Sequence, residues 1–353
     1  MLNNEKGNAG RNIYSASVLS VTAITLIILF ILDLITGPVK IPVPQVISSI
    51  FHLKAENELW NSVLFDFRIP KALTALIAGA SLSISGLQMQ TIFRNPLAGP
   101  DVLGISAGAS LGVAVVVMGF GNLFSRGDLP YLSGWLQIIA ACAGSAAVLL
   151  IVMAVSLRVS DIMTILILGI LFGSAISAIV SIIQYFSEQS VLKTFIIWSM
   201  GNLGSLTKSQ MNVLLMSTLA GLILTILSVK RLNVLLAGET YARSLGINLK
   251  SSRLLIFLST SILTGSVTAF CGPIGFVGIA VPHLARTILR SSDHRLIVPG
   301  SILFGGVLLL LSDLISQLPS QDTVLPVNAV TSLLGIPVVI WIIFRNRKIV
   351  GLS

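Results

Sequence analysis

Side chains able to do acid–base, nucleophilic or metal chemistry are sparse in this sequence. The three histidines, His52, His283 and His294, lie far apart, and no cluster of His, Cys and carboxylate residues suggests a metal site. No Ser-His-Asp set stands out, and the phosphate-binding G-x-x-x-x-G-K-[ST] motif is absent, since the nearest stretch, GSLTKS at 204–209, lacks its glycine spacing. The sequence therefore supports an enzyme only weakly and predicts no cofactor bound by this chain.

Charged residues that could meet a partner stand at the start of one apolar run. The stretch DFRIPKALTALIAGASL (66–82) opens with Asp66, Arg68 and Lys71 and then carries no further charge. Charges before an apolar run are ordinary at a membrane boundary, where they orient or anchor a helix. What these cations contact depends on the elements around them.

The composition is that of a membrane protein. Of 353 residues, 54% are hydrophobic and only 10% are charged, with a mean hydropathy of +0.96, whereas soluble domains carry roughly 25% charged residues. The net charge of +9 comes from cations placed mainly in short gaps between apolar runs, which is an orientation signal and gives no support to nucleic-acid binding. We expect an all-α polytopic membrane protein that forms a single transmembrane domain over 1–353.

Ten apolar runs are long enough to cross a bilayer, which takes about 20 residues. The first is long for a signal peptide and has no clear cleavage site, so we expect a retained span. Very short Gly- and Pro-rich connections join the second run to the third and the seventh to the eighth, and merging or dropping one of these runs would leave nine. The predicted spans are 15–36, 68–92, 100–119, 134–156, 161–186, 210–229, 253–271, 274–290, 296–315 and 326–344.

The distribution of Lys and Arg predicts the orientation. With ten spans and the N-terminus inside, 15 of the 22 cations lie inside, which favours cytoplasmic termini. Arg68 and Lys71 then lie outside, against the general trend. The predicted outside set is Lys40, Lys54, Arg68, Lys71, Arg126, Lys193 and Lys208.

Residues within the spans are mostly small or apolar. Stretches such as LIAGASLSISG (76–86) and GISAGASLG (104–112) allow helix backbones to approach closely. Asp33, Asp101 and Asp313 lie near predicted span ends, where we expect snorkelling or helix capping, and the lack of a mid-span acid counts against an ion-coupled carrier. Cys142 and Cys271 lie in apolar segments, and we expect them to pack rather than form a disulfide or bind metal.

Two stretches of the chain resemble each other. RNPLAGPDVLGISAGASLG (94–112) and FCGPIGFVGIAVPHLAR (270–286) each carry Gly-Pro, a few apolar residues, and then Gly-Ile with a small residue. The span model places them at opposite membrane faces, as in the inverted repeats of transporters. The alternative is two unrelated helix breaks.

The longest predicted cytoplasmic gap is KRLNVLLAGETYARSLGINLKSSR (230–253). Within it, GETYARSLGI predicts a short amphipathic helix that Gly246 ends, because glycine suits the position after a helix C-terminus. Such a helix could dock a soluble partner, or the gap could be a solvated loop that only anchors orientation.

These stretches resemble the FecCD family, the permease subunits of ATP-driven importers for ferric siderophores, haem and cobalamin. The resemblance runs from about residue 15 to 348. It rests on RIPKALTALIAGASLSISGLQMQTIFRNPLAGPDVLGISAGASLG (68–112), GETYARSLGI (238–247), GPIGFVGIAVPHLAR (272–286), SDHR (292–295) and LPVNAVTSLLGIPVVIWII (325–343).

The resemblance implies ten helices per subunit, an inverted repeat, and a permease dimer of two copies or two homologues in the cytoplasmic (inner) membrane. It also implies two partner ATPase subunits, which bind the ATP and Mg²⁺, and an extracytoplasmic binding protein that delivers the ligand. The cargo would be an iron chelate or, alternatively, cobalamin. By similarity, the coupling residues are Gly238, Glu239, Ala242, Arg243, Leu245 and Gly246.

The resemblance also implies a role for the opening cations. An R-x-P-R element in the family offers its cations to glutamates of the binding protein, and Arg68 and Lys71 occupy the matching places here. Lysine keeps the charge but lacks the two-pronged donor of arginine, and a further family cation near the last span has no counterpart in DLISQLPSQDTVLP (313–326). Interfacial anchoring is the alternative.

The family's pathway is lined chiefly by the fifth and tenth spans. Small or weakly polar residues there are the candidates for lining it, with packing at the dimer interface as the alternative. They are Gly169, Gly173, Ser174, Ser177, Asn328, Thr331 and Ser332.

Overall fold

The computed structural model describes residues 2–37, 39–50, 58–119, 130–159, 161–204, 206–318 and 324–350, and every regular element within them is helical. His52, Lys54, Arg126 and residues 319–323 lie outside the described residues. The α-helices are α1 (Leu2–Ile35), α2 (Val43–Ile50), α3 (Glu58–Ser62), α4 (Ile69–Ile92), α5 (Ile105–Ala114), α7 (Pro130–Arg158), α8 (Ile162–Tyr185), α9 (Gln189–Ser199), α10 (Lys208–Leu235), α11 (Glu239–Ser244), α12 (Leu249–Cys271), α13 (Val277–Leu289), α14 (His294–Ser316) and α15 (Val327–Val350).

Seven helical stretches in the described residues are long and apolar enough to cross a membrane. Three shorter apolar helices, Ile105–Gly119, Val277–Leu289 and Val327–Trp341, coincide with predicted spans. The all-α polytopic class is thus confirmed, whereas the count of ten spans stays a prediction. Helix ends differ from the predicted spans mainly by extension: α1 begins well before residue 15, and α3 with a π-helical segment, η1 (Val63–Arg68), precedes α4.

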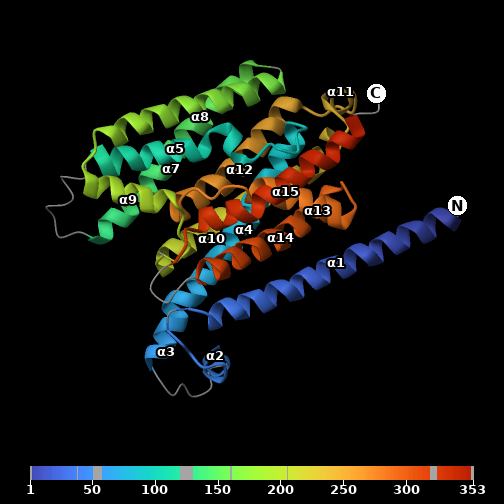
Figure 1. The fold of residues 1–353 in the computed structure, drawn as a ribbon. Coiled ribbons are helices and arrows are strands. Elements are labelled where there is room, and N and C mark those ends of the chain that lie inside the picture. The colour runs from blue at the N-terminus through green and yellow to red at the C-terminus, as the bar shows by residue number, and fades with distance from the viewer. Residues whose placement is uncertain are drawn as a thin grey trace.

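Helix α4 lies in the middle of the bundle, with α8 at one edge and α1 at the opposite edge (Figure 1). Two glycines of α4 touch other backbones directly: a Cβ at Gly79 would collide with Gly305 of α14, and one at Gly86 would collide with Gly278 of α13. The expectation of close helix approach through small residues is therefore confirmed at these crossings.

A buried amide joins α4 to two further helices. Gln88 Nε2 donates to Thr225 Oγ1 of α10 and to Ser259 Oγ of α12, both at 3.0 Å, and its Oε1 accepts from Thr260 Oγ1 at 2.7 Å. All four side chains are fully buried. Because a buried polar group without a partner costs roughly 1–3 kcal/mol, this network specifies how α4, α10 and α12 align.

The two stretches that resemble each other in sequence also share a backbone conformation. Each contains Gly-Pro and then enters a short helix through a left-handed residue, Gly104 (φ +73°) before α5 and Phe276 (φ +65°) before α13. Between Pro100 and Leu103 the first stretch also forms a 3₁₀ turn, η2. The breaks meet beside α4, where Gly278 packs against Pro100. Burial against protein is what permits irregular backbone at membrane depth, while the inverted topology of the two halves stays a prediction.

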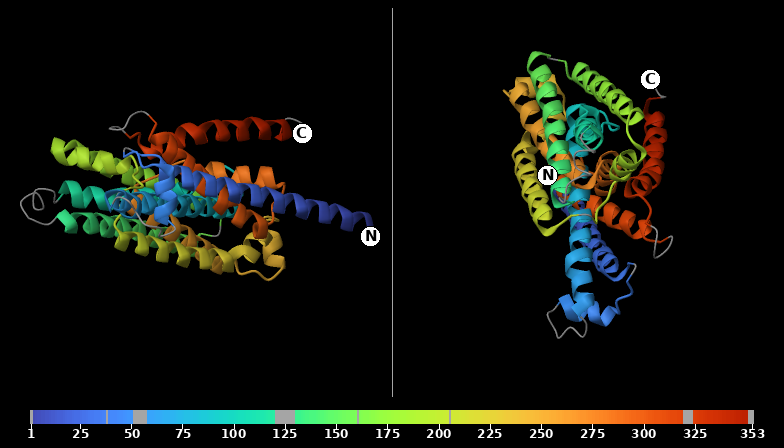
Figure 2. Two further views of the ribbon diagram at one scale, coloured as in Figure 1. Left: turned by 90° about the horizontal axis from the view of Figure 1, so that it is seen from below. Right: turned by 90° about the vertical axis from the view of Figure 1, so that its left-hand side faces the viewer.

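The bundle has two ends, which the starts and ends of its helices define. At one, here called the Lys71 end, α1 and α14 finish while α4 and α10 begin. At the other, the α11 end, α10 finishes and α14 begins, and the N-terminal part of α1 extends beyond the bundle on this side (Figure 2). This alternation matches the predicted span directions, and which end faces the cytoplasm stays a prediction.

Candidate functional site

Arg68 lies inside the protein at the Lys71 end. Its side chain is only 6% exposed, and its guanidinium donates to the carbonyls of Leu34 (2.7 Å) and Ile35 (2.9 Å) and to that of Val39. Carbonyls at a helix C-terminus have no intrahelical donor and carry partial negative charge, so a cation suits this place. In this structure Arg68 caps α1 and does not present its charge to the outside.

Lys71 is held by a carboxylate of another helix. Its Nζ lies 2.7 Å from Asp313 Oδ2 of α14, with the lysine 24% and the aspartate 1% exposed. Gln317 Nε2 bridges Asp313 Oδ2 (3.0 Å) and Asp33 Oδ1 (3.1 Å), which joins α1 to the same group. The expectation that Asp33 and Asp313 snorkel or cap helices is wrong, because both are buried in an ion-paired cluster.

Exposed charge at the Lys71 end lies beside the two predicted docking cations. Lys208 Nζ of α10 pairs with Asp66 Oδ1 of the π-helical segment at 2.8 Å, and these side chains are 69% and 46% exposed. The distribution of cations in the sequence predicted Lys208 to lie outside but indicated no role for it. Its exposure makes it the more accessible cation for a partner, and the docking role of Arg68 and Lys71 stays a prediction.

Helix α11 projects at the α11 end and stops firmly, as predicted. Gly246 has φ +77°, its N–H donates to Arg243 O (2.9 Å), and the N–H of Ile247 donates to Ala242 O (3.0 Å). These two bonds form a Schellman motif, in which a left-handed glycine satisfies the last helical carbonyls. The predicted helix and its glycine stop are confirmed.

The predicted coupling residues divide into those that hold α11 and those that it displays. Ala242 is fully buried, and Glu239 Oε1 accepts from Arg253 Nη2 of α12 at 2.6 Å. Gly238 is buried at the start of the helix with φ +107°. The exposed residues are Arg243, Leu245 and Gly246, together with Tyr241 and Ser244 on the same projection.

On α8, the four candidate pathway residues fall on two faces. Gly169 and Gly173 pack against η2 and Gly104, so they serve helix approach. Ser174 and Ser177 are exposed, and Ser181, which the sequence reasoning missed, continues their line at helical spacing. Each of these hydroxyls donates to a carbonyl of its own helix, Ile170, Gly173 and Ser177 respectively. The exposed face of α8 thus carries a weakly polar line.

An aspartate fixes the start of α8. Asp161 accepts from the hydroxyl (2.6 Å) and the amide (2.8 Å) of Thr164 and from the amide of Met163 (3.3 Å). These hydrogen bonds, above all those from Thr164, lower the pKa of Asp161, so the cap is ionised at neutral pH. The line of serines therefore sits on a helix with a well-defined N-terminus.

On α15, the candidate residues are mainly structural. Asn328 Oδ1 accepts from Gly275 N at 2.9 Å, which ties the helix start to the segment before α13. Thr331 is fully buried, and both it and the half-buried Ser332 donate to the Asn328 carbonyl. Of this group Asn328 and Ser332 are partly open to the surroundings.

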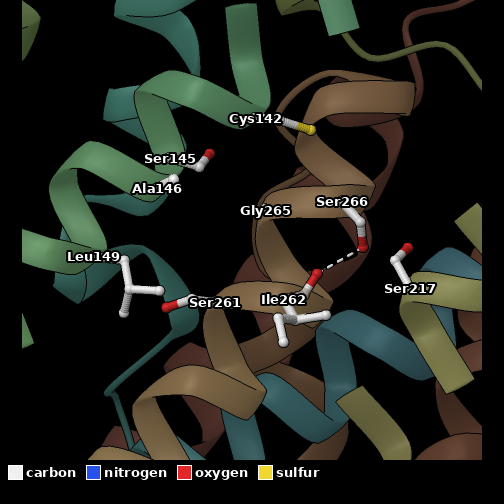
Figure 3. Close-up of a pocket in the computed structure, with 9 residues that line it drawn as sticks. All are labelled: Cys142, Ser145, Ala146, Leu149, Ser217, Ser261, Ile262, Gly265 and Ser266. Carbon is white, nitrogen blue, oxygen red and sulfur yellow. Dashed lines mark hydrogen bonds between the residues drawn. The ribbon is translucent and has the colours of Figure 1, made fainter. Parts of the chain in front are cut away.

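A small hollow of about 230 Å³ lies between α7, α10 and α12 (Figure 3). Its hydroxyls are mostly engaged with nearby backbone, as Ser266 is with Ile262 O at 2.6 Å and Ser217 with Leu214 O at 2.9 Å. Cys142 at its rim is exposed, whereas Cys271 is buried, and both thiols are free. The hollow is consistent with imperfect packing of small side chains, and the packing expectation holds for Cys271 alone.

A polar chain runs through the bundle near the α11 end. Half-buried Arg286 of α13 donates to Gln90 Oε1 (3.0 Å) and Thr91 Oγ1 (3.1 Å) of α4. Thr91 Oγ1 also meets His294 Nε2 at 2.8 Å, and His294 Nδ1 lies 2.7 Å from Asn233 Oδ1 of α10. His294 is thus a link between helices, and no group of three or more metal-ligating side chains occurs among the residues that the structure describes.

The whole arrangement has clear matches among known proteins. The model of the FecCD transport family matches residues 25–345. The chain belongs to the FecCD transport family. Hemin transport system permease protein HmuU of Yersinia pestis is 35% identical over 301 residues, which cover 85% of this FecCD-family chain and 88% of HmuU.

Two further matches agree with this assignment. Vitamin B12 import system permease protein BtuC of Salmonella typhi is 35% identical over 296 residues, covering 84% of this chain and 87% of BtuC. A solved transporter described as of the metal-chelate ABC type, in an inward-facing conformation, matches with a TM-score of 0.80 at 28% identity. That match covers 94% of this chain and 99% of the other. This FecCD-family chain is therefore a multi-pass permease component of an ABC transporter.

Proposed function

We propose that this chain is the permease subunit of an ATP-driven importer that carries an iron chelate, a ferric siderophore or haem, across the cytoplasmic membrane. Hydrolysis of ATP would occur in two partner ATPase subunits, and an extracytoplasmic binding protein would deliver the ligand. The bias of cations toward one side supports placing both termini and the α11 end in the cytoplasm.

The observation that carries this proposal is the fixed projection of α11. A Schellman motif ends the helix, the Glu239–Arg253 pair ties it to α12, and Tyr241 and Leu245 remain 53% and 55% exposed. Exposed apolar side chains on a rigid element suit a docking contact. A motion of the ATPases would then pass to α12 through a short, firmly held helix.

A second permease copy or a homologue would cover the faces of α8 and α15. Both helices expose large apolar residues, among them Ile167 and Leu171 of α8 and Leu333 and Phe344 of α15. With two copies together, the serine line of α8 would border a weakly polar passage. Such a passage suits a bulky ligand that must cross without being held.

For the cargo, cobalamin is the second candidate. HmuU and BtuC, named for hemin and vitamin B12, are each 35% identical to this chain, so overall identity does not separate the two ligands. The matching solved transporter is described as of the metal-chelate type, a term that covers ferric siderophores, haem and the cobalt chelate cobalamin, so it does not separate the two ligands either. Because the binding protein selects much of the ligand, its affinity is the discriminating measurement.

For the binding protein, we propose docking at the Lys71 end, where Lys208 and Asp66 are exposed beside Arg68 and Lys71. Reversal of Lys208 to Glu is expected to weaken binding of an acidic partner surface, and the effect should shrink with added salt. If docking instead depends on Arg68 and Lys71, those cations must first leave their present partners. Unchanged binding of K208E at low salt, with loss in R68K, would favour that second account.

Reconstituted vesicles test the function directly. The permease with its ATPases and binding protein should accumulate radiolabelled iron chelate only with internal ATP and Mg²⁺, and accumulation should stop when the ATPase is omitted. Accumulation without ATP would instead indicate a secondary carrier. Uptake of cobalamin but of neither siderophore nor haem would refute the iron assignment while leaving the importer intact.

A further inference from the structure

A second, larger hollow opens on the surface between α10 and α14 at the α11 end. Its volume is about 470 Å³, and its apolar lining includes Leu222 and Ile226 of α10 with Val298 and Ile302 of α14. Two cations, Lys230 of α10 and Arg295 of α14, also line it. From Leu222 to Lys230, the lining extends about 12 Å along α10, at 1.5 Å per residue.

The hollow is apolar toward the membrane interior and cationic toward the helix ends. Lys230 and Arg295 are both exposed, and neither belongs to an ion pair within the described part of the chain. Ile226 is 66% exposed, so this face is open to whatever surrounds the bundle. A groove of this form offers separate surfaces for an apolar chain and for an anionic group.

Among the described residues, the carboxylate beside these cations is that of Asp293, and it is already engaged. Asp293 Oδ1 accepts from Asn233 Nδ2 at 2.7 Å and from the amide of Arg295 at 2.9 Å. These bonds, first that from the Arg295 amide, lower the pKa of Asp293, so it is ionised at neutral pH. Two cations still outnumber one anion here, and the local charge stays positive.

A proline of α14 lies in the groove. Pro299 lies inside α14 and lines the hollow. Since proline has no N–H, the carbonyl of Arg295 lacks its usual helical donor four residues on.

We propose that this groove binds an anionic phospholipid, with one acyl chain along Leu222, Ile226 and Ile302 and the phosphate between Lys230 and Arg295. Basic pockets between membrane helices on the cytoplasmic side commonly bind anionic headgroups. Placement in the cytoplasmic leaflet rests on the orientation proposed above, whereas the groove itself does not depend on it. The bound lipid would brace α10 against α14 at the end where α11 projects.

Native mass spectrometry of the purified full-length permease, titrated with phosphatidylglycerol or phosphatidylcholine, tests this proposal. We expect the wild type to retain phosphatidylglycerol preferentially. The K230Q/R295Q variant should lose about 30-fold in apparent affinity, since each cation near the surface contributes about fivefold. The charge-preserving K230R/R295K variant should keep the preference.

A matched control and a steric variant sharpen the result. Arg158 and Lys250 are exposed cations at the same end that do not line the groove, so R158Q/K250Q should bind like the wild type. Filling the groove with V298W should weaken phosphatidylglycerol binding without any change of charge. Size-exclusion profiles and melting temperatures report whether each variant is folded.

Several outcomes would overturn the proposal. Equal retention of both lipids, or equal loss in the control and groove variants, would remove the specific site. Exclusion of lipid by a concentration-dependent dimer, released by V298W, would assign the groove to a second copy of the chain. None of these measurements needs ATPase, binding protein or transport, so their failure is separate from failure of the proposed function.

Discussion

At the scale of single residues, the two cations at the start of α4, Arg68 and Lys71, bind within the chain. Arg68 satisfies carbonyls at the end of α1, and Lys71 neutralises a carboxylate that is 1% exposed. Both residues stand beside a predicted membrane boundary, where an unpaired cation would ordinarily reach for water or headgroups. Their contacts instead join α4 to α1 and α14 and hold the Lys71 end together.

Removal of the Lys71 charge should destabilise the protein strongly. The K71M variant leaves buried Asp313 without its cation, and breaking a buried pair from one side costs about 3–5 kcal/mol. The K71M/D313L double variant should recover part of that loss, because the pair is then removed from both sides while buried Asp33 keeps Gln317 as a partner. Unfolding by denaturing detergent measures the free energies for the cycle.

The exposed pair at the same end is the control for that cycle. K208M removes the Lys208–Asp66 pair, which is worth about 0–1 kcal/mol. A loss in K208M as large as that in K71M would contradict the assignment of burial as the cause.

Any substitution of Arg68 should lower the stability of the protein. An R68A variant leaves three carbonyls without donors, and hydrogen bonds to charged groups contribute about 1.5–3 kcal/mol each, so a loss of about 3 kcal/mol or more is expected. The R68K variant keeps the charge but cannot reach all three carbonyls at once, and should fall between. Melting temperatures in detergent rank the three proteins, and wild-type stability of R68A would refute the capping role.

At the scale of elements, direct backbone contact and local capping do most of the positioning. Gly79 and Gly86 bring α4 against α14 and α13, while the Schellman motif and the Glu239–Arg253 pair hold α11. The glycine contacts determine how the helices of the bundle pack, and the cap and ion pair of α11 determine which side chains this helix exposes. They can be tested separately.

A methyl group at Gly79 should disrupt the α4–α14 crossing. Its Cβ would overlap the backbone of Gly305, which has no flexible side chain to move away, and overpacking of this kind costs about 1–3 kcal/mol or more. The matched control is G134A in α7, where the nearest atom, Gln210 Nε2, would lie 3.6 Å from the new Cβ. Alanine there should be neutral or stabilising by about 0.5–1 kcal/mol, as the melting temperature will show.

Gly246 should matter for coupling more than for folding. In G246A the left-handed conformation costs about 1–2 kcal/mol and loosens the end of α11, whereas G246N should restore it because asparagine tolerates this conformation. We expect G246A and E239Q to hydrolyse ATP while accumulating less ligand per ATP. G246A should melt slightly below the wild type, whereas E239Q should be less stable because the nearly buried Arg253 loses its carboxylate. Normal coupling in both variants would remove α11 from the coupling role.

At the scale of the whole molecule, the sequence predicts patterns that are local along the chain. Apolar runs located the spans, and the glycine after GETYARSL located the end of α11, because both signals lie within a few turns. The partners of Lys71 and Arg286 lie about 200 residues or more away and could not be paired from spacing. Arg286 was one of the 15 inside cations and was counted only for orientation, whereas its guanidinium donates to Gln90 and Thr91 of α4. Ser181 could have been predicted from the sequence, since it continues the spacing of Ser174 and Ser177.

The orientation predicts which residues water-soluble reagents reach. With Cys142 and Cys271 replaced by alanine, K208C should react with an impermeant maleimide in intact cells, and L245C only after permeabilisation. Spheroplasts supply the preparation where an outer membrane blocks access. The reverse pattern would invert the proposed topology.

The glycine contacts of α4 have a consequence for motion. A one-residue slide of α4 past α14 or α13 would bring a side chain to a place where only a hydrogen atom fits. These crossings therefore fix the register of α4 against both helices. The most apolar stretch of the span containing α4 is 83% buried, against 17% for that of α8. In any cycle between open and closed states, α4 is therefore expected to stay in place. The peripheral helices are expected to move relative to it.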